Sequence, residues 1–322
     1  MQRRTFIKNS TAVLSALPFI NSVPYPLRNI LLTEELNVFK FKMGQINCTL
    51  FRDFLFKYLA KDFFTNANEP ELNQLLLKYK ATPDNIPSPF IALLLEYDNK
   101  KVLIDTGAGY SEKEVIINGR PIPFKGVLQE LLLKQGIKKD EITHVILTHF
   151  HPDHIGGIFD DTAKLIYPNA QFITHADEWD YWSTEQALSR SAVFRYFIEK
   201  NVQGLKDHNF RLITGDFVEV LPGVTAIKAD GHTPGHIGLA IQSEKKGLLY
   251  ISDTVLHPGH IEHLDWQTSY DSDHDKAKQS RIKMLELAYK EDMLVNAFHF
   301  DFPGLGRIDK HENNWVWKYT EK

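Results

Sequence analysis

Residues 148–157 read THFHPDHIGG, so that His149, His151, Asp153 and His154 stand within one short loop, directly ahead of two glycines. Four such side chains would repel one another when protonated and would lose hydration when buried. A bound cation removes both difficulties, because imidazole nitrogens and carboxylate oxygens are ligands of Zn²⁺. The loop therefore predicts a metal site, and its glycines let the chain turn away beneath the metal.

The remaining candidate ligands also follow apolar runs. Residues 144–147 predict a short strand that delivers the histidine loop at its C-terminal end, where open α/β folds bind ligands. His232 lies in GHTPGH (231–236), Asp253 follows LYIS (249–252), and His299 follows the apolar run that begins at residue 293. Taken singly, each of the three fits a capped loop residue as well as a metal ligand.

Composition narrows the class of protein. The chain has 322 residues, 43% hydrophobic and 24% charged, which is ordinary for a globular protein of one large or two smaller domains. The formal charge of −4 and the absence of basic runs interleaved with aromatics argue against nucleic acid and favour a small-molecule substrate. Cys48 is the one cysteine, which excludes an intrachain disulfide and a thiolate zinc cluster, so a metal must rest on histidine and carboxylate.

Residues 1–27 are expected to be a signal peptide. The Arg3-Arg4 pair, Phe6 and Lys8 precede a mildly apolar stretch, as in twin-arginine export signals, and the cleavage site stays open because no Ala-x-Ala triplet is present. A frayed basic terminus is the alternative. The apolar stretch is shorter than the ~20 residues of a membrane span. We expect export to the periplasm or beyond through the twin-arginine machinery, with 28–322 as a single catalytic domain.

The pattern of elements predicts the fold class. Strands are expected at 39–49, 89–97, 101–105, 144–147, 164–174 (a pair), 210–229, 237–242, 248–251 and 293–300, and helices at 69–79, 124–135, 176–200 and 273–289. Helices lie between pairs of strands in both halves. This order predicts an α/β fold in which two β-sheets pack together with helices outside.

From about Asn37 onward the chain resembles the metallo-β-lactamase superfamily, whose H-x-H-x-D-H motif stands here at 149–154. The resemblance implies the αβ/βα four-layer sandwich and two Zn²⁺ per chain, with Fe or Mn as alternatives at the second site. By the resemblance, one metal is held by His149, His151 and His232, a second by Asp153, His154 and His299, and Asp253 bridges both. A hydroxide between the metals would be the nucleophile, which makes Asp153 and Asp253 the catalytic carboxylates.

Two more residues are expected to support the metals. Asp105, in LIDTG (103–107), matches a family position that usually buttresses the metal loop through hydrogen bonds, with a strand-end cap as the alternative. His236 lies four residues past His232. A supporting role is favoured for it, because three ligands per metal are already supplied and catalysis needs an open position.

Within the superfamily, the chain is similar to exported methyl parathion hydrolases and quorum-quenching lactonases, through THFHPDHIGG, GHTPGH, Asp253 and HFDFPGLG (299–306). This implies hydrolysis of a small neutral ester, lactone or phosphotriester. Leu256 stands where some lactonases have a tyrosine, so the resemblance does not predict a tyrosine-assisted lactone opening from this position. A β-lactam hydrolase and a non-catalytic metal- or ligand-binding protein are the alternatives, and a homodimer stays open.

Aromatic residues of the 176–200 segment are expected to line the substrate pocket. The candidates are Trp179, Trp182, Phe194 and Phe197, together with Leu256 and with His257 from a histidine-rich run. The alternative is that about half of the aromatics are core residues at helical spacing. Walls of this kind carry no fixed charge, so a neutral substrate is favoured over an anionic β-lactam.

Overall fold

The computed structural model describes residues 37–110, 115–117, 120–122, 125–312 and 314–320. Two seven-stranded sheets form its centre, with strand orders β1-β2-β3-β4-β7-β8-β9 and β10-β11-β12-β13-β14-β15-β16. The predicted signal peptide lies outside the described residues. Within the described ranges, no helix has the length and apolar character needed to cross a bilayer.

The strands are mostly antiparallel, with parallel pairs at β4–β7, β7–β8, β8–β9 and β13–β14. The strands of the first sheet are β1 Val38–Met43, β2 Ile46–Tyr58, β3 Ile86–Tyr97, β4 Lys100–Ile104, β7 His144–Ile146, β8 Gln171–His175 and β9 Phe210–Ile213. Those of the second are β10 Phe217–Leu221, β11 Val224–Lys228, β12 Ile237–Ser243, β13 Lys246–Tyr250, β14 Leu294–Asn296, β15 Leu305–His311 and β16 Asn314–Tyr319. A separate hairpin joins β5 Val115–Ile117 to β6 Arg120–Ile122.

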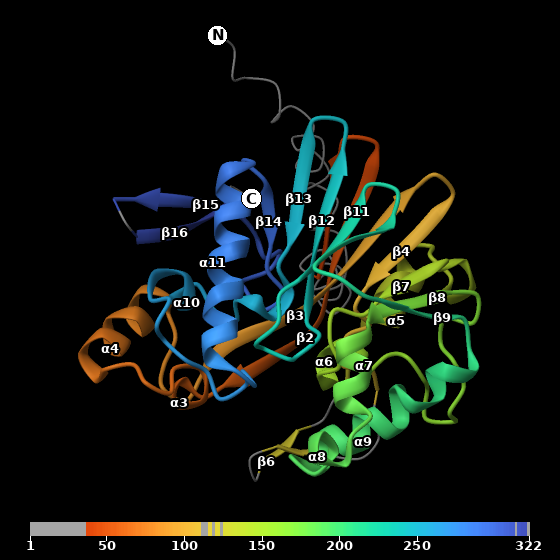
Figure 1. The fold of residues 1–322 in the computed structure, drawn as a ribbon, viewed down its shortest axis with the longest axis horizontal. Coiled ribbons are helices and arrows are strands. Elements are labelled where there is room, and N and C mark those ends of the chain that lie inside the picture. The colour runs from red at the N-terminus through yellow and green to blue at the C-terminus, as the bar shows by residue number, and fades with distance from the viewer. Residues whose placement is uncertain (1–36, 111–114, 118–119, 123–124, 313, 321–322) are drawn as a thin grey trace, which may run out of the picture.

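Helices cover the outer faces of both sheets (Figure 1). The helices of the described ranges are α3 Ala60–Phe63, α4 Glu69–Lys78, α5 Leu128–Lys134, α6 Pro152–Ile155, α7 Ala176–Trp182, α8 Glu185–Leu188, α9 Ala192–Asn201, α10 Gly259–Glu262 and α11 His274–Lys290. Short 3₁₀ turns are η2 Lys139–Glu141, η3 Gln203–Asp207 and η4 Ser252–Thr254. Helix α5 packs on β2 and α7 on β8, while α10 packs on β16 and α11 on β15. The four-layer α/β sandwich that the sequence predicts is therefore confirmed.

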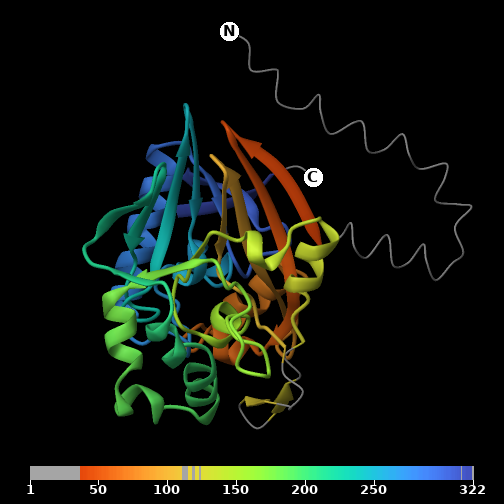
Figure 2. The ribbon, with the colours of Figure 1, turned by 90° about the vertical axis from the view of Figure 1, so that its right-hand side faces the viewer.

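The core lies between the sheets, because both present apolar faces to each other. Leu93–Leu95 of β3 and Leu239 and Ile241 of β12 are fully buried in one cluster. The Tyr250 hydroxyl of β13 crosses the interface to the Ile91 carbonyl of β3 at 3.3 Å. Figure 2 shows helices α7–α9 (green) gathered at one end of the strands. Helix α6, which contains Asp153 and His154, packs on α9 there.

Local sequence explains the turn between β3 and β4 and the start of α11. The Asp98-Asn99 turn has positive φ at both residues and joins β3 to β4 as a tight hairpin. Asp273 caps α11 by accepting a hydrogen bond from the Lys276 N–H at 3.1 Å.

Three expectations for the strands were wrong. The single strand expected at 39–49 is a hairpin that turns at Gly44, whose φ is +57°, and its second arm β2 extends to Tyr58. Only one strand, β8, forms where a pair was expected at 164–174. The first half of that segment contributes only an isolated bridge between Leu165 and Phe159. The strand expected over 293–300 ends at Asn296, and the hairpin β15–β16 follows it.

Candidate metal centre and active site

The histidine loop leaves the first sheet at the end of β7 and enters α6 at once. His151 is the N-cap of α6 and Pro152 occupies its first position, so that Asp153 and His154 lie on the first helical turn. The His154 carbonyl accepts hydrogen bonds from the Thr106 N–H at 2.8 Å and from the Thr106 hydroxyl at 2.9 Å. The loop is therefore fixed against the segment that follows β4.

The two glycines are required by this close contact. A Cβ on Gly156 would lie 1.9 Å from the Ala108 carbonyl oxygen, and one on Gly157 would lie 2.4 Å from that of Thr106. No side chain fits at such distances from backbone atoms. The glycines let two loops touch, in addition to letting the chain turn.

The structure gathers the seven predicted ligands into two buried groups. One group is His149, His151, His232 and Asp253, and the other is Asp153, His154 and His299. Within each group the candidate ligand atoms lie within 4.8 Å of one another. The residues come from the ends of β7, β11, β13 and β14, so both sheets contribute to the centre.

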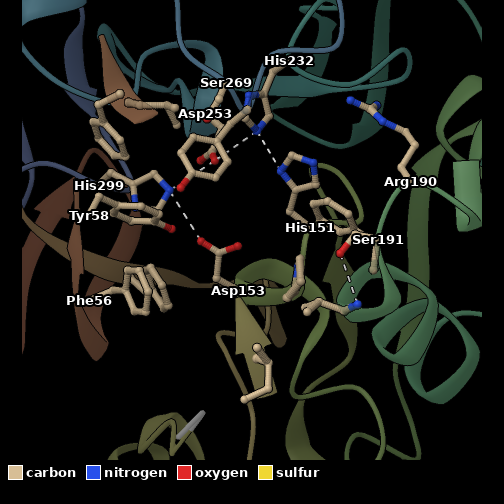
Figure 3. Close-up of a pocket in the computed structure, with 18 residues that line it drawn as sticks. Phe56, Tyr58, His151, Asp153, Arg190, Ser191, His232, Asp253, Ser269 and His299 are labelled. Atoms are coloured by element: carbon tan, nitrogen blue, oxygen red, sulfur yellow. Dashed lines mark hydrogen bonds and ion pairs between the residues drawn. The ribbon is translucent and has the colours of Figure 1, made fainter. Parts of the chain in front are cut away.

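Asp253 lies between the two groups (Figure 3). Its Oδ2 atom is 3.3 Å from His232 Nε2 and 3.8 Å from His149 Nε2 in the first group, and 3.2 Å from His299 Nε2 in the second. Its Oδ1 atom is 3.3 Å from His154 Nε2. One carboxylate thus faces imidazole nitrogens of both groups, as a residue that contacts two metals must.

The donor set fits a pair of metal ions. Among the described residues, His149 Nε2, His154 Nε2, Asp153 Oδ2 and Asp253 Oδ1 are buried at the centre without a hydrogen-bond partner. Such groups are costly unless something pairs with them. Burial, and then the neighbouring histidines, hold the pKa of His149 and of His151 well below the usual range, so both rings are neutral and offer lone pairs. Divalent cations would satisfy all four atoms.

Asp105 and His236 lie where support was expected. The Asp105 carboxylate is 2.8 Å from His154 Nδ1 and accepts hydrogen bonds from the Thr148 N–H at 2.8 Å and from the Tyr250 hydroxyl at 3.0 Å. It can therefore orient the His154 ring with Nε2 toward the centre. His236 Nε2 accepts from the Asp253 N–H at 3.2 Å, and its Nδ1 donates to the Ala229 carbonyl at 3.1 Å. Both of its nitrogens are used, which leaves none for a metal.

Sequence reasoning missed a buried ion pair behind His232. Asp271 Oδ1 lies 3.0 Å from His232 Nδ1, and Asp271 Oδ2 accepts from Arg281 Nη2 at 2.5 Å. Arg281 is 2% exposed and also donates to the carbonyls of Trp266 and of Thr254, the residue after Asp253. This cation therefore connects helix α11 to two loops of the centre. The sequence carries no local signal for either residue.

Glu178 of α7 was also missed. Its buried carboxylate accepts four hydrogen bonds, from the N–H groups of Phe150 and Gly235, the Thr233 hydroxyl and the Trp182 indole, at 2.6–3.0 Å. Phe150 stands between His149 and His151, and Thr233 follows His232. One side chain thus ties together the two loops that supply the first group. Ser88 of β3 similarly lies 2.9 Å from His299 Nδ1.

A cavity of about 320 Å³ opens onto both groups. One wall is aromatic and apolar, formed by Phe56, Tyr58, Phe63, Phe90, Leu256 and Tyr270. The opposite wall comes from Arg190, Ser191, Val193 and Phe194. Burial, and next the nearby Asp153 carboxylate, raise the pKa of Tyr58 well above its usual range.

Most of the residues predicted to line the pocket lie elsewhere. Phe194 and Leu256 do line the cavity, and the Phe194 ring stacks on His151 with centroids 5.0 Å apart. Trp182 is 1% exposed because its indole donates to Glu178, and Phe197 is 2% exposed in the core. Trp179 packs on Phe210, while His257 is buried between Phe64 and Tyr79.

Arg190 corrects the expectation that the walls carry no fixed charge. Its exposed guanidinium lines the cavity and donates to the Tyr181 hydroxyl at 2.6 Å. In Figure 3 it lies on the far side of His151 from the aromatic wall. The cavity is therefore mainly apolar with a cation at one side.

Residues 92–291 match the sequence model of the metallo-beta-lactamase superfamily, and the chain therefore belongs to this superfamily. Two curated relatives are N-acyl homoserine lactonases. One, from Bacillus cereus, is 28% identical over 60% of this chain and 75% of its own length, and one from Bacillus sp is 25% identical over 74% and 92%. The chain is thus a metal-dependent hydrolase related to lactonases.

Solved structures agree with the fold. AidC, described as a dizinc quorum-quenching lactonase in complex with the product N-hexnoyl-L-homoserine, is 25% identical with a TM-score of 0.75, over 89% of this chain and 98% of its own. The hydrolase AbOPH is 22% identical with a TM-score of 0.77, over the same shares of the two chains. The second likeness concerns the fold alone.

Proposed function

We propose that this protein is a dinuclear zinc hydrolase that cleaves a small neutral lactone, ester or phosphotriester, with a lactone bearing an apolar acyl chain as the leading candidate. The observation that carries the proposal is the position of Asp253. Its carboxylate faces imidazole nitrogens of both groups at 3.2–3.8 Å, beside a cavity with an aromatic wall.

The chain's own residues would divide the work as follows. His149, His151 and His232 would hold one ion, Asp153, His154 and His299 the other, and Asp253 would contact both. When bound, two zinc ions supply a water whose pKa is lowered toward about 7, and they polarise the substrate oxygen. Asp105 orients His154, and Asp271 orients His232. The cavity's apolar side chains exclude bulk water and hold the acyl chain.

The relatives support a lactone. AidC is described with the ring-opened product of an acyl-homoserine lactone, which carries a six-carbon chain. An apolar chain of that kind could lie against Phe56, Phe63 and Phe90, which present no charge. Native zinc is proposed on the same relative and on the all-histidine-and-carboxylate donor set.

A second candidate, hydrolysis of an anionic β-lactam, is favoured by one observation. Arg190 places an exposed cation at the cavity, where a substrate carboxylate could bind. The aromatic wall opposite favours the neutral substrate. A non-catalytic protein is the alternative from another class, and the complete donor set argues against it.

The test compares kcat/KM of the zinc-loaded protein for four substrates: an acyl-homoserine lactone, an aryl ester, a methyl phosphotriester and a penicillin. We expect a neutral substrate to be hydrolysed best and about two metal equivalents to be bound. Fewer than about 1.5 equivalents would contradict the dinuclear site. Best turnover of penicillin would favour the second candidate, and turnover of none of the four would refute the proposed function.

Export is a separate proposal. Residues 1–27 would act as a twin-arginine signal and 28–322 as the exported catalytic domain, which the Arg3-Arg4 pair supports. Changing both arginines to lysine should leave precursor in the cytoplasm, measured by cell fractionation. Normal export of that variant would show that the pair is not the signal.

A further inference from the structure

Tyr58 brings a hydroxyl into the cavity beside both candidate metal groups. It is the last residue of β2 and lines the cavity together with Asp153, Asp253 and His299. In Figure 3 its hydroxyl points toward the space between His299 and Asp153. No dashed line in that view ends on this hydroxyl, whereas His299 is joined to Asp153. With respect to the described residues, the phenol thus keeps its hydrogen available for donation at the place where a substrate must lie.

The ring of Tyr58 is held by contacts on several sides. Its centroid lies 4.6 Å from those of Phe56 and Phe63, and 5.3 Å from that of Tyr270. It also meets the His299 ring edge-on at 6.0 Å. A side chain packed in this way has few alternative rotamers, so its hydroxyl is already oriented before a substrate binds.

Few other side chains near Asp253 could donate a hydrogen bond to a substrate in the cavity. Leu256, three residues after Asp253, lines the cavity but offers no hydroxyl. Ser191 and Arg190 lie on the opposite wall, on the far side of His151 in Figure 3. Tyr270 shares the aromatic wall with Tyr58, and its ring contacts Tyr58 and Phe63. The Tyr58 ring, in contrast, also meets the ring of the candidate ligand His299.

We propose that Tyr58 is a catalytic residue that donates a hydrogen bond to the departing oxygen when the leaving group is an alkoxide, as in a lactone. This inference rests on the proposed function and deepens it. Hydrolysis joins the oxygen of water to the acyl carbon, breaks the bond from that carbon to the departing oxygen, and transfers a proton of the water to that oxygen. Tyr58 keeps its own proton throughout and stabilises the charge that develops as the bond breaks.

The proposal makes a prediction about leaving groups. An alkoxide is a poor leaving group and needs a donor, whereas a nitrophenolate spreads its charge over the ring and departs without one. Tyr58→Phe removes the hydroxyl and keeps the packed ring. We expect kcat for the lactone to fall about 100-fold, as for loss of one donor to a developing oxyanion, and kcat for a nitrophenyl ester of the same acyl chain to change less than about threefold. KM should change little for either.

The matched control is Tyr270→Phe, which removes a hydroxyl from the same wall. It should lower turnover of the two substrates by similar, small factors. A second readout is the calorimetric affinity of the zinc-loaded protein for the ring-opened hydroxy acid, which we expect Tyr58→Phe to weaken about tenfold. Metal content and melting temperature should equal those of the unmodified protein in both variants.

The outcomes separate the two proposals. Suppose that the unmodified protein hydrolyses the lactone. If Tyr58→Phe then slows the lactone and the nitrophenyl ester equally, or slows neither of them, the role of Tyr58 is refuted while the proposed function stands. If Tyr270→Phe shows the selective loss instead, Tyr58 is again refuted. If the unmodified protein hydrolyses neither lactone nor ester, the proposed function fails, and the role of Tyr58 fails with it.

Discussion

Asp271 Oδ1 lies 3.0 Å from His232 Nδ1, and both side chains are buried. The pair is the carboxylate–histidine arrangement that fixes the tautomer of a metal ligand, here with Nε2 toward Asp253. Arg281 Nη2 donates to the other oxygen of Asp271 at 2.5 Å, so the buried carboxylate has a cation as its partner.

The Asp271→Asn variant tests this arrangement. We expect metal affinity to fall about 10- to 100-fold, because an amide holds the imidazole less firmly and donates less charge to it. Competition with a chelator measures the effect. Asp273→Asn is the control: it changes a carboxylate two residues away that caps α11, and metal affinity should stay the same. Equal metal affinities of the Asp271→Asn and Asp273→Asn variants would show that Asp271 does not support the metal centre.

Asp253→Ala should abolish turnover while the protein stays folded. The carboxylate faces both groups, so its loss leaves each group without the ligand they share. We expect kcat to fall by at least about 1000-fold and the bound metal to drop below two equivalents. Unchanged kcat would refute the assignment of Asp253, and a melting curve distinguishes loss of metal from loss of fold.

Phe194 and Phe197 form a matched pair for the cavity wall. Phe194 stacks on His151 at the cavity, whereas Phe197 is 2% exposed in the core. Phe194→Ala should cost about 1–3 kcal/mol in kcat/KM for the best neutral substrate with little change in stability. Phe197→Ala should instead lower the free energy of unfolding by about 3–5 kcal/mol. If Phe194→Ala instead lowered only stability and Phe197→Ala lowered kcat/KM, Phe194 would not form the cavity wall.

Arg190→Gln distinguishes the two candidate substrates. A neutral lactone does not need the cation, so its kcat/KM should change less than about threefold. If a penicillin is hydrolysed at all, its KM should rise. The control is Arg195→Gln, which changes a half-buried arginine of the same segment that pairs with Glu185. A large loss of lactone hydrolysis in Arg190→Gln alone would show that the neutral substrate contacts this guanidinium.

Cys48 should be unreactive in the folded protein. It is 1% exposed, and burial raises the pKa of its thiol from 9.0 to about 12. Thiol reagents at pH 9 should therefore label the chain only after denaturant is added. Because the folded pKa is raised, the stability that the neutral thiol contributes is present below pH 9 and is lost as pH rises from 9 toward 12. Rapid labelling without denaturant would contradict this burial.

The ligand residues could be predicted because each is a local signal. His149 to His154 occupy one loop, and His232, Asp253 and His299 each follow an apolar run. The residues that support these ligands could not be predicted, because each contacts a residue that is far away in the sequence. Asp271 meets His232 across 39 positions, and Glu178 meets Phe150 across 28.

The cavity wall was misjudged for two physical reasons. Helical spacing predicts which aromatics share a face but not which way that face points, and Trp182 turns inward because its indole satisfies Glu178. The aromatic wall comes partly from the end of β2, which continues nine residues beyond the strand expected at 39–49. The far end of β2 is a strand because it pairs with β3, and that pairing cannot be predicted from the sequence of β2 alone.

The aromatic wall and the metal ligands are built from different stretches of chain. Phe56, Phe63 and Phe90 line the cavity but belong to segments that supply none of the seven ligands. Mutations at these phenylalanines can therefore change which molecule is accepted, while the metal ligands and Tyr58 are kept. A chain organised in this way can acquire a new substrate in small steps, each of which leaves a working enzyme for selection to act on.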